Sequence, residues 1–190
     1  MAEVKPMREE AFVLLKEYNK SEGLIKHALA VEAVTIYDIR YTRDEGVIGL
    51  VHDLDYEQFP RQHCWKTQEI LTSRNWPDEY IRAVLSHGWG ICTDVEPKSD
   101  LEKALYAVGE QGSGGESTAL VRPSKSVMDM EAKSVKKKWK EKSFAAGVNR
   151  DVIEKGAAML GVELTSLIED VIMGMREAAE QIGLKGNPTA

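Results

Sequence analysis

The chain has 190 residues, of which 43% are hydrophobic and 29% are charged, a balance typical of a folded globular domain rather than a disordered chain. Its net charge of −6 argues against general nucleic-acid binding over the whole surface. No apolar run approaches the roughly 20 residues that span a bilayer, and the stretch MAEVKPMREE lacks the apolar core of a signal peptide. We therefore expect a cytoplasmic protein with no membrane segment, whose cysteines Cys64 and Cys92 are reduced thiols.

Apolar residues recur at helical spacing along most of the chain, whereas the alternation typical of strands is scarce. We expect Pro6 to open a first helix, because proline fits a first turn. A second helix spans about 21–39 and carries an apolar stripe that faces a core. Asp44 is a good N-cap for a third helix that extends to Leu54, and a fourth helix lies within 62–73.

Capping signals define the remaining predicted helices. A fifth helix runs from Pro77 to Gly88, and a capping box at 99–102 begins a sixth. A seventh spans about 127–138, and an eighth runs from a cap at Asn149 to Gly161. A ninth is capped at 165 or 166 and ends near 182. The sequence thus predicts one all-α bundle of about eight or nine helices, with an N-terminal helix in 1–20, the main domain at 21–183 and a tail at 184–190.

One basic run stands out, because six lysines fall between 133 and 142. Such a run is usually a solvated helical face, although it could also attract phosphate to the rim of an active site. The run alone does not decide between the two.

The four histidines are the first residues that indicate a metal site. His27 lies on the apolar face of the second predicted helix, where a histidine is more often a satisfied core residue than a ligand. His52 and Asp53 lie together at the buried end of the third helix, where a carboxylate is costly unless a hydrogen bond, water or a cation compensates it. Imidazole and carboxylate suit a divalent transition metal. His63 and His87 stand at ends of predicted helices, where neighbouring helices converge at one pole of a bundle.

The order of these residues resembles the H…HD…H…H pattern of the HD superfamily of metal-dependent phosphohydrolases. The surrounding segments are similar to a subgroup of small stand-alone bacterial and archaeal HD hydrolases: LIKHALAVEAV, GLVHDLDYE, AVLSH, SDLEKALYAV, TALVRPSKSV and KSFAAGVNRD. The resemblance covers roughly 23–183 and implies an HD-type helical domain.

This resemblance also implies roles for individual residues. His27, His52 and Asp53 match the ligands of a first divalent metal, which could be Mn, Co, Mg, Fe, Ni or Zn. His63 and His87 match positions that hold a second metal or the substrate phosphate, so that Asp53, His63 and His87 are the implied catalytic residues. The implied reaction is metal-assisted hydrolysis of a phosphate ester in a small phosphorylated substrate, for example a nucleotide.

Three cations are candidates for binding the substrate phosphate: Lys66, Arg122 and Lys125. Each of them is equally well explained as a surface group. Trp89, beside His87, is similarly either a wall of the pocket or an ordinary packing residue.

The chain departs from the family pattern where a later helix closes the metal shell with an aspartate, in a context like ALYAVDEL. Here the text is ALYAVGEQGSGGES, so Gly109 stands in place of that ligand. Glu110 is no obvious substitute, because one residue along a helix turns a side chain by about 100°. Asp94 and Asp100 lie upstream and would reach the site only through a rearranged loop.

The residues after Gly109 also weaken the expected helix. The stretch 111–117 contains three glycines and two serines, and each interior glycine costs about 1 kcal/mol of helix stability relative to alanine. We therefore expect the sixth helix to end near Val108 and a loop to occupy 109–118.

Three functions remain open at this point. The first is an HD-type phosphohydrolase, since two histidines and one carboxylate suffice in other metal sites with open positions. The second is a non-catalytic HD-fold module that binds a nucleotide or a protein partner, which Gly109 favours. The third is a mixed-ligand iron oxygenase, because a few HD-fold proteins oxidise their substrates.

Overall fold

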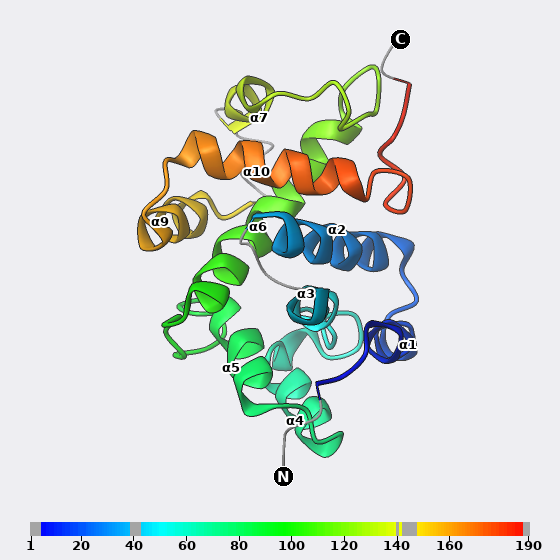
Figure 1. Ribbon diagram of the computed structural model, residues 1–190, viewed down its shortest axis with the longest axis vertical. Coiled ribbons are helices and arrows are strands. Elements are labelled where there is room, and N and C mark those ends of the chain that lie inside the picture. Colours follow the sequence, from blue (N-terminus) through cyan, green and yellow to red (C-terminus); the bar gives the residue numbers. More distant parts are fainter. Residues whose placement is uncertain (1–4, 39–42, 140, 142–147, 188–190) are drawn as a thin grey trace.

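The structure is a computed structural model that describes residues 5–38, 43–139, 141 and 148–187 (Figure 1). Within these ranges the chain is all-α, as the apolar periodicity predicts. The helices are α1 (Arg8–Tyr18), α2 (Glu22–Asp38), α3 (Arg43–Val51), the short 3₁₀ helix η1 (Pro60–Gln62), α4 (Trp65–Ser73), α5 (Asp78–His87), α6 (Asp100–Leu120), α7 (Ala132–Trp139), α9 (Arg150–Leu160) and α10 (Leu164–Glu177). No helix among the described residues is both long enough and apolar enough to cross a membrane.

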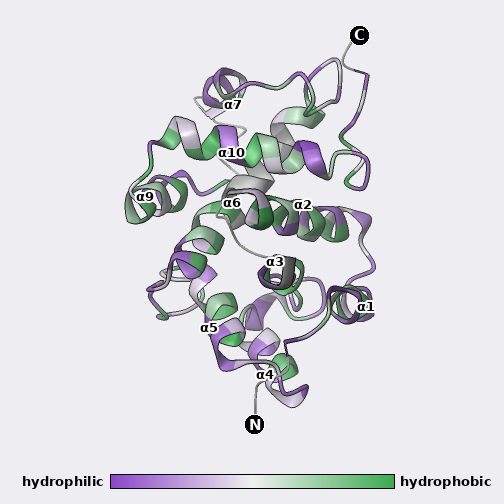
Figure 2. Cartoon of the chain, in the orientation of Figure 1, coloured by the Kyte–Doolittle hydropathy of each residue, from purple (hydrophilic) through white to green (hydrophobic). Residues whose placement is uncertain are grey.

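Helix α2 lies at the centre of the bundle, between α3 and α10, and α6 packs against α2, α5 and α9 (Figure 1). Figure 2 shows hydrophobic stretches along α2 and α10, whereas α7 is largely hydrophilic. The core at this contact includes Val34 of α2 and Val171 of α10, both with no exposed surface. This arrangement leaves the N-terminal half of α2 beside the end of α3, where the histidines lie.

The close approach of α3 to α2 depends on Gly49. A Cβ atom at this position would lie 2.8 Å from the backbone nitrogen of Glu32 and 3.0 Å from the carbonyl carbon of Val31. Only glycine therefore lets the two backbones touch without a shift. Because His52 lies one turn after Gly49, this contact determines how close His52 comes to α2.

Several predicted helix boundaries are confirmed. Pro77 and Gly88 flank α5 as its N-cap and C-cap. The capping box at the start of α6 is present, with Ser99 as the N-cap and Glu102 completing it. Asn149 caps α9, and a left-handed residue ends that helix at 161, as predicted.

Other predicted boundaries are wrong. Helix α3 already includes Asp44, so this residue is not its N-cap, and the helix ends at Val51 rather than at Leu54. The early end has a physical reason: a continuing helix would pair the Gly49 carbonyl with the amide of Asp53, but here the imidazole of His52 donates to that carbonyl.

The first and last turns of other helices also differ from expectation. Helix α1 begins at Arg8, after Pro6, whereas α4 lies within the predicted range 62–73 and follows a 3₁₀ turn that the apolar pattern did not indicate. Helix α7 begins at Ala132, because 127–130 form a turn before it, of which only Val127 and Met130 are buried. The N-cap of α10 is Glu163 rather than 165 or 166, and α10 ends at Glu177, followed by turns through 183.

The predicted loop at 109–118 is the main correction to the fold, because α6 continues without a break to Leu120. Tertiary packing offsets the low helix propensity of this stretch. Gly115 is buried against α10, and a Cβ atom there would lie 2.8 Å from the sulfur of Met175. Thr118 and Ala119 in the last turn are also buried. The small residues thus allow α6 to pass close to α10.

The N-terminal helix is attached to α2 by an ion pair with one buried partner. Arg8 bonds both carboxylate oxygens of Glu32, whose side chain is only 5% exposed. We expect Arg8→Ala to lower the free energy of unfolding by about 2 kcal/mol, because it leaves a buried carboxylate without its guanidinium. Chemical denaturation measures this change.

Arg74 and Glu17 provide a matched control, because they form a similar two-point pair in which both side chains are exposed. Arg74→Ala should cost less than about 1 kcal/mol. Equal losses in the two variants would contradict the role assigned to burial.

Candidate metal centre

The four histidines of the chain converge on the carboxylate of Asp53. His27 comes from α2, His52 and Asp53 from the turn after α3, His63 from the residue after η1, and His87 from the last position of α5. All four rings turn Nε2 towards Asp53. Residues separated by 60 positions in the sequence thus form one cluster, of which His27 and His52 are buried.

The two oxygens of Asp53 face different pairs of histidines. Oδ2 lies 3.6 Å from Nε2 of His27 and 3.3 Å from Nε2 of His52. Oδ1 lies 3.4 Å from Nε2 of His63 and 3.3 Å from Nε2 of His87. One carboxylate therefore lies between two pairs of imidazoles.

These separations are too long for strong hydrogen bonds, which join an imidazolium and a carboxylate at about 2.7–2.9 Å. They suit ligands around an ion, because bonds of about 2.1 Å place neighbouring ligand atoms roughly 3.0–3.5 Å apart. Two groups of side chains in the described part of the chain have ligand atoms close enough to hold an ion. One is His27, His52 and Asp53, and the other is His63, Cys64 and His87.

Hydrogen bonds at Nδ1 orient three of the histidines. His52 donates to the carbonyl of Gly49 at 2.8 Å, and His87 donates to the carbonyl of Val84. His63 bonds Oδ1 of Asp55 through its Nδ1 at 2.8 Å. Because a carbonyl oxygen can only accept, Nδ1 of His52 and Nδ1 of His87 each carry a proton, and Nε2 of each ring faces Asp53. Such outer hydrogen bonds are how proteins prepare histidines for metals.

Asp55 is not among the predicted site residues, although it follows Asp53 by two positions in the segment HDLD. It has no exposed surface. Its Oδ1 bonds His63, and its Oδ2 accepts the backbone N–H of Thr67 at 2.8 Å. Asp55 is thus a positioning residue that links the site to the first turns of α4.

Electrostatics keep the central carboxylate ionised. Burial opposes the ionisation of Asp53, but the charges and hydrogen bonds of His52 and His87 outweigh it and hold the pKa of this carboxyl well below its usual range. Burial in turn lowers the pKa of His52, although Asp53 opposes that shift. An ionised carboxylate beside a neutral imidazole is the protonation state that binds a cation.

The pKa of His63 shifts the other way. Burial lowers it, but the hydrogen bond to Asp55 and the charge of Asp53 outweigh burial, and the net pKa is raised. A raised folded-state pKa means that protonated His63 stabilises the fold below its unfolded pKa, and that this stabilisation disappears as the pH rises through the folded value.

We therefore expect the difference in unfolding free energy between wild type and His63→Gln to decrease as the pH rises from about 6 to about 8 in the presence of a chelator. Denaturation curves at a series of pH values measure this difference. In an Asp55→Asn background the same pH dependence should be weaker. A difference that stays flat or grows with pH would contradict the pairing.

Gly109 faces this cluster from α6. A Cβ atom at Gly109 would lie 3.9 Å from Cδ2 of His52, with no other heavy atom of neighbouring elements within 4 Å. The position is buried, and it has room for a side chain directed at the histidines. Position 109 thus lies on a helix beside the site rather than in a loop.

Two of the three predicted phosphate-binding residues lie away from this site. Lys66 lies in the first turn of α4, close in sequence to His63, where it pairs with Glu69 and lies 5.4 Å from the ring of Phe59. Arg122 and Lys125 lie beyond the end of α6, and the helix from 109 to 120 spans about 16 Å.

The side chain of Arg122 is already engaged by Asp129 and Ser134 in the α6–α7 connection. Lys125 is exposed in the same connection, to which residues 184–187 bond through Leu184 and Asn187. The structure therefore does not bring either residue to the four histidines.

The other sequence features lie around or away from the cluster. The ring of Trp89 packs at 5.8 Å from that of Tyr106, with Nζ of Lys155 3.4 Å above it, which is a packing role. In the lysine run, Lys133 pairs with Glu131 and Lys138 with Glu141, while 140 and 142 lie outside the described residues.

Comparison with known proteins does not assign the chain to a group. No protein-family model matches it, and neither does any curated protein or solved structure.

Proposed function

We propose that this protein is a metal-dependent phosphohydrolase of the HD type that acts on the phosphate ester of a small molecule such as a nucleotide. The observation that supports this most strongly is the central carboxylate, Asp53, with each of its oxygens facing two imidazoles at 3.3–3.6 Å. Simple core histidines would not need a common ionised partner, nor Nδ1 hydrogen bonds that direct Nε2 inward.

In this proposal His27, His52 and Asp53 hold one divalent ion. His63 and His87 then either contribute to a second ion or bind the phosphate itself. A bound divalent ion would lower the pKa of a water molecule and neutralise charge on the phosphoryl oxygens.

Side chains and backbone carbonyls of the chain determine the net charge of the metal site and the orientation of its histidines. Asp53 supplies one negative charge, so that a divalent ion leaves the site positive and attractive to a phosphate group. Asp55 holds His63 in place, and the backbone carbonyls of Gly49 and Val84 do the same for His52 and His87. Among the predicted phosphate-binding cations, Lys66 is the nearest in sequence to the histidine cluster, three residues after His63.

The experiment is phosphate release from p-nitrophenyl phosphate and from a panel of nucleotides, with chelated protein to which Mn²⁺, Co²⁺, Mg²⁺ or Zn²⁺ is returned. We expect release that depends on the added metal, stops with chelator and is strongly reduced in His52→Gln. Arg122→Ala is the control and should retain the wild-type rate. No release in any metal, and none in Gly109→Asp, would contradict the proposal.

Gly109 favours a second function, because it has no side chain to bind a metal at the position where the family pattern has an aspartate. In that case the chain is a non-catalytic module that binds a nucleotide or a protein partner. Nucleotide binding measured by calorimetry, without any phosphate release and without any metal dependence, would support this second function over the first.

A further inference from the structure

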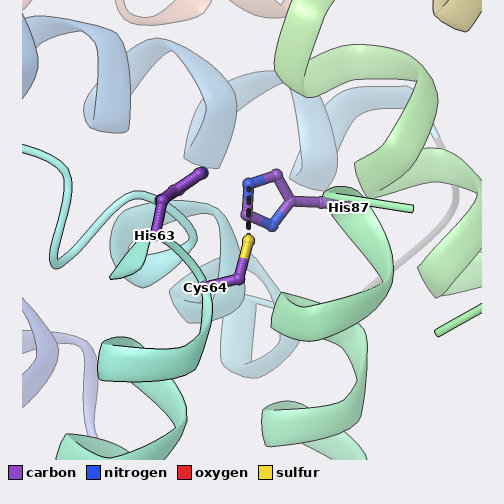
Figure 3. A group of neighbouring side chains, drawn as sticks. All are labelled: His63, Cys64 and His87. Carbon is purple, nitrogen blue, oxygen red and sulfur yellow. Dashed lines mark hydrogen bonds between the residues drawn. The ribbon is translucent and has the colours of Figure 1, made fainter. Parts of the chain in front are cut away.

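The two cysteines of the chain lie in contact beside the histidine cluster. Sγ of Cys64 is 3.0 Å from Sγ of Cys92 and 3.9 Å from Nε2 of His87. Figure 3 shows Cys64 directed at the ring of His87, with His63 beside Cys64. The cysteines come from positions 28 residues apart, in the turn before α4 and in the loop after α5.

Several local features hold the two sulfur atoms together. Cys64 has a backbone φ of 68°, a conformation that a non-glycine residue adopts only when its surroundings impose it. Gly88 leaves the space that both sulfurs occupy, since a Cβ there would lie 2.3 Å from the sulfur of Cys92 and 2.7 Å from that of Cys64. The indole of Trp65 donates to the carbonyl of Cys92 at 3.0 Å. These backbone and packing features hold the two cysteines close together where the turn before α4 meets the loop after α5. This region is the α4–α5 junction.

We propose that Cys64 and Cys92 form a reversible disulfide under peroxide, which makes this junction a redox modification site. A disulfide bond is about 2.05 Å long, so the sulfurs need to move together by about 1 Å. Cys92 is partly exposed and Cys64 is fully buried. Cys92 is therefore the sulfur that meets the oxidant, and Cys64 is the sulfur that resolves it.

The chemistry balances with hydrogen peroxide as the oxidant. The sulfur of Cys92 attacks one peroxide oxygen and breaks the O–O bond, which yields a sulfenic acid and one water molecule. The sulfur of Cys64 then attacks the sulfur of Cys92, loses its proton and expels the hydroxyl group as a second water molecule. Two thiols are oxidised by two electrons in total, and one peroxide is reduced to two water molecules.

The disulfide has a consequence for the histidine cluster, and this part rests on the proposed function. Cys64 directly follows His63, and its sulfur belongs to the same group of close ligand atoms as Nε2 of His87. Oxidation removes that sulfur as a ligand and draws the two segments together. Zn²⁺, which favours sulfur and nitrogen ligands, should therefore bind the oxidised protein at least about tenfold more weakly than the reduced protein.

The test uses the full chain treated with one to two equivalents of hydrogen peroxide, followed by alkylation and intact mass measurement. We expect a loss of about 2 Da, no alkylation, and recovery of two alkylated thiols after dithiothreitol. Trypsin should release the peptide 62–66 joined to the peptide 83–98. In Cys92→Ser the buried Cys64 should stay unmodified at the same dose, whereas in Cys64→Ser the exposed Cys92 should gain oxygen.

The results that would overturn the proposal are equally distinct. Addition of oxygen to wild-type Cys92 without loss of about 2 Da, a covalent dimer on a non-reducing gel, or two free thiols after treatment would each contradict it. The peptide map needs no variant, so it remains decisive if either serine variant does not fold. Zn²⁺ affinity that is equal in the two redox states would overturn the link to the histidines, whereas the disulfide itself is judged by the peptide map alone.

Discussion

Asp53→Asn is expected to abolish metal binding and phosphate release, while the fold is retained. Asparagine has the shape of aspartate but lacks its charge, and its amide nitrogen cannot bind a cation. Because Asp53 faces all four histidines, the substitution removes the one anionic group at the centre of the cluster. We expect the affinity for Mn²⁺ or Zn²⁺ to fall on the order of 1,000-fold, equivalent to about 4 kcal/mol.

Thermal denaturation with and without metal measures this effect independently of activity. A ligand that binds only the folded state at 100 times its Kd stabilises that state by about 2.7 kcal/mol, so the wild-type melting temperature should rise with metal and that of Asp53→Asn should not. Asp129→Asn is a suitable control, because Asp129 pairs with Arg122 and Ser124 in the α6–α7 connection. An Asp53→Asn protein that responds to metal like wild type would contradict the assignment of Asp53.

Gly109→Asp is expected to act in the opposite direction and to increase both metal affinity and phosphate release. The new Cβ would have room beside His52, and its carboxylate would be directed at the cluster from α6. One additional anionic ligand should raise metal affinity by about tenfold or more. In chelator, however, the same carboxylate is buried beside Asp53 without a cation, and the protein should be less stable than wild type.

Gly109→Ala is the control that distinguishes the effect of a new metal ligand from the effect of replacing a glycine within a helix. It removes the glycine penalty and should stabilise the protein by about 1 kcal/mol both with and without metal. The signature of a metal ligand is therefore a lower melting temperature of Gly109→Asp in chelator and a larger rise on addition of metal. If Gly109→Asp and Gly109→Ala responded to metal equally, position 109 would not belong to the site.

The sequence predicted the all-α fold because periodic apolar residues report directly which helical faces are buried. It also singled out the histidines that converge, since three of the four lie in or beside the ends of helices that meet at one pole. It failed for α6, where the glycines and serines suggested a loop. The contact of Gly115 with Met175 of α10 joins residues 60 positions apart, and no local propensity encodes such a contact.

The parts of the site that depend on tertiary contacts were also beyond sequence reasoning. The pattern HDLD shows both aspartates, but only the fold reveals that Asp55 bonds Nδ1 of His63 and the backbone of Thr67, while Asp53 faces Nε2 of the same histidine. Arg122 was a reasonable phosphate ligand by charge alone, yet its guanidinium is engaged by Asp129. The sequence shows which side chains carry a positive charge that could bind phosphate. It does not show that α6 extends to Leu120 and places Arg122 away from the histidines.

We propose that His27, His52 and Asp53 hold a divalent metal ion. Crystals of the chain grown with Mn²⁺ and measured at the manganese absorption edge test this claim most directly. We expect an anomalous peak about 2.1–2.3 Å from Nε2 of His27, Nε2 of His52 and Oδ2 of Asp53. The crystals should contain Mn²⁺ at a concentration that gives the maximal rise in melting temperature in solution. An anomalous map with no peak among these three residues would then contradict the proposed metal site.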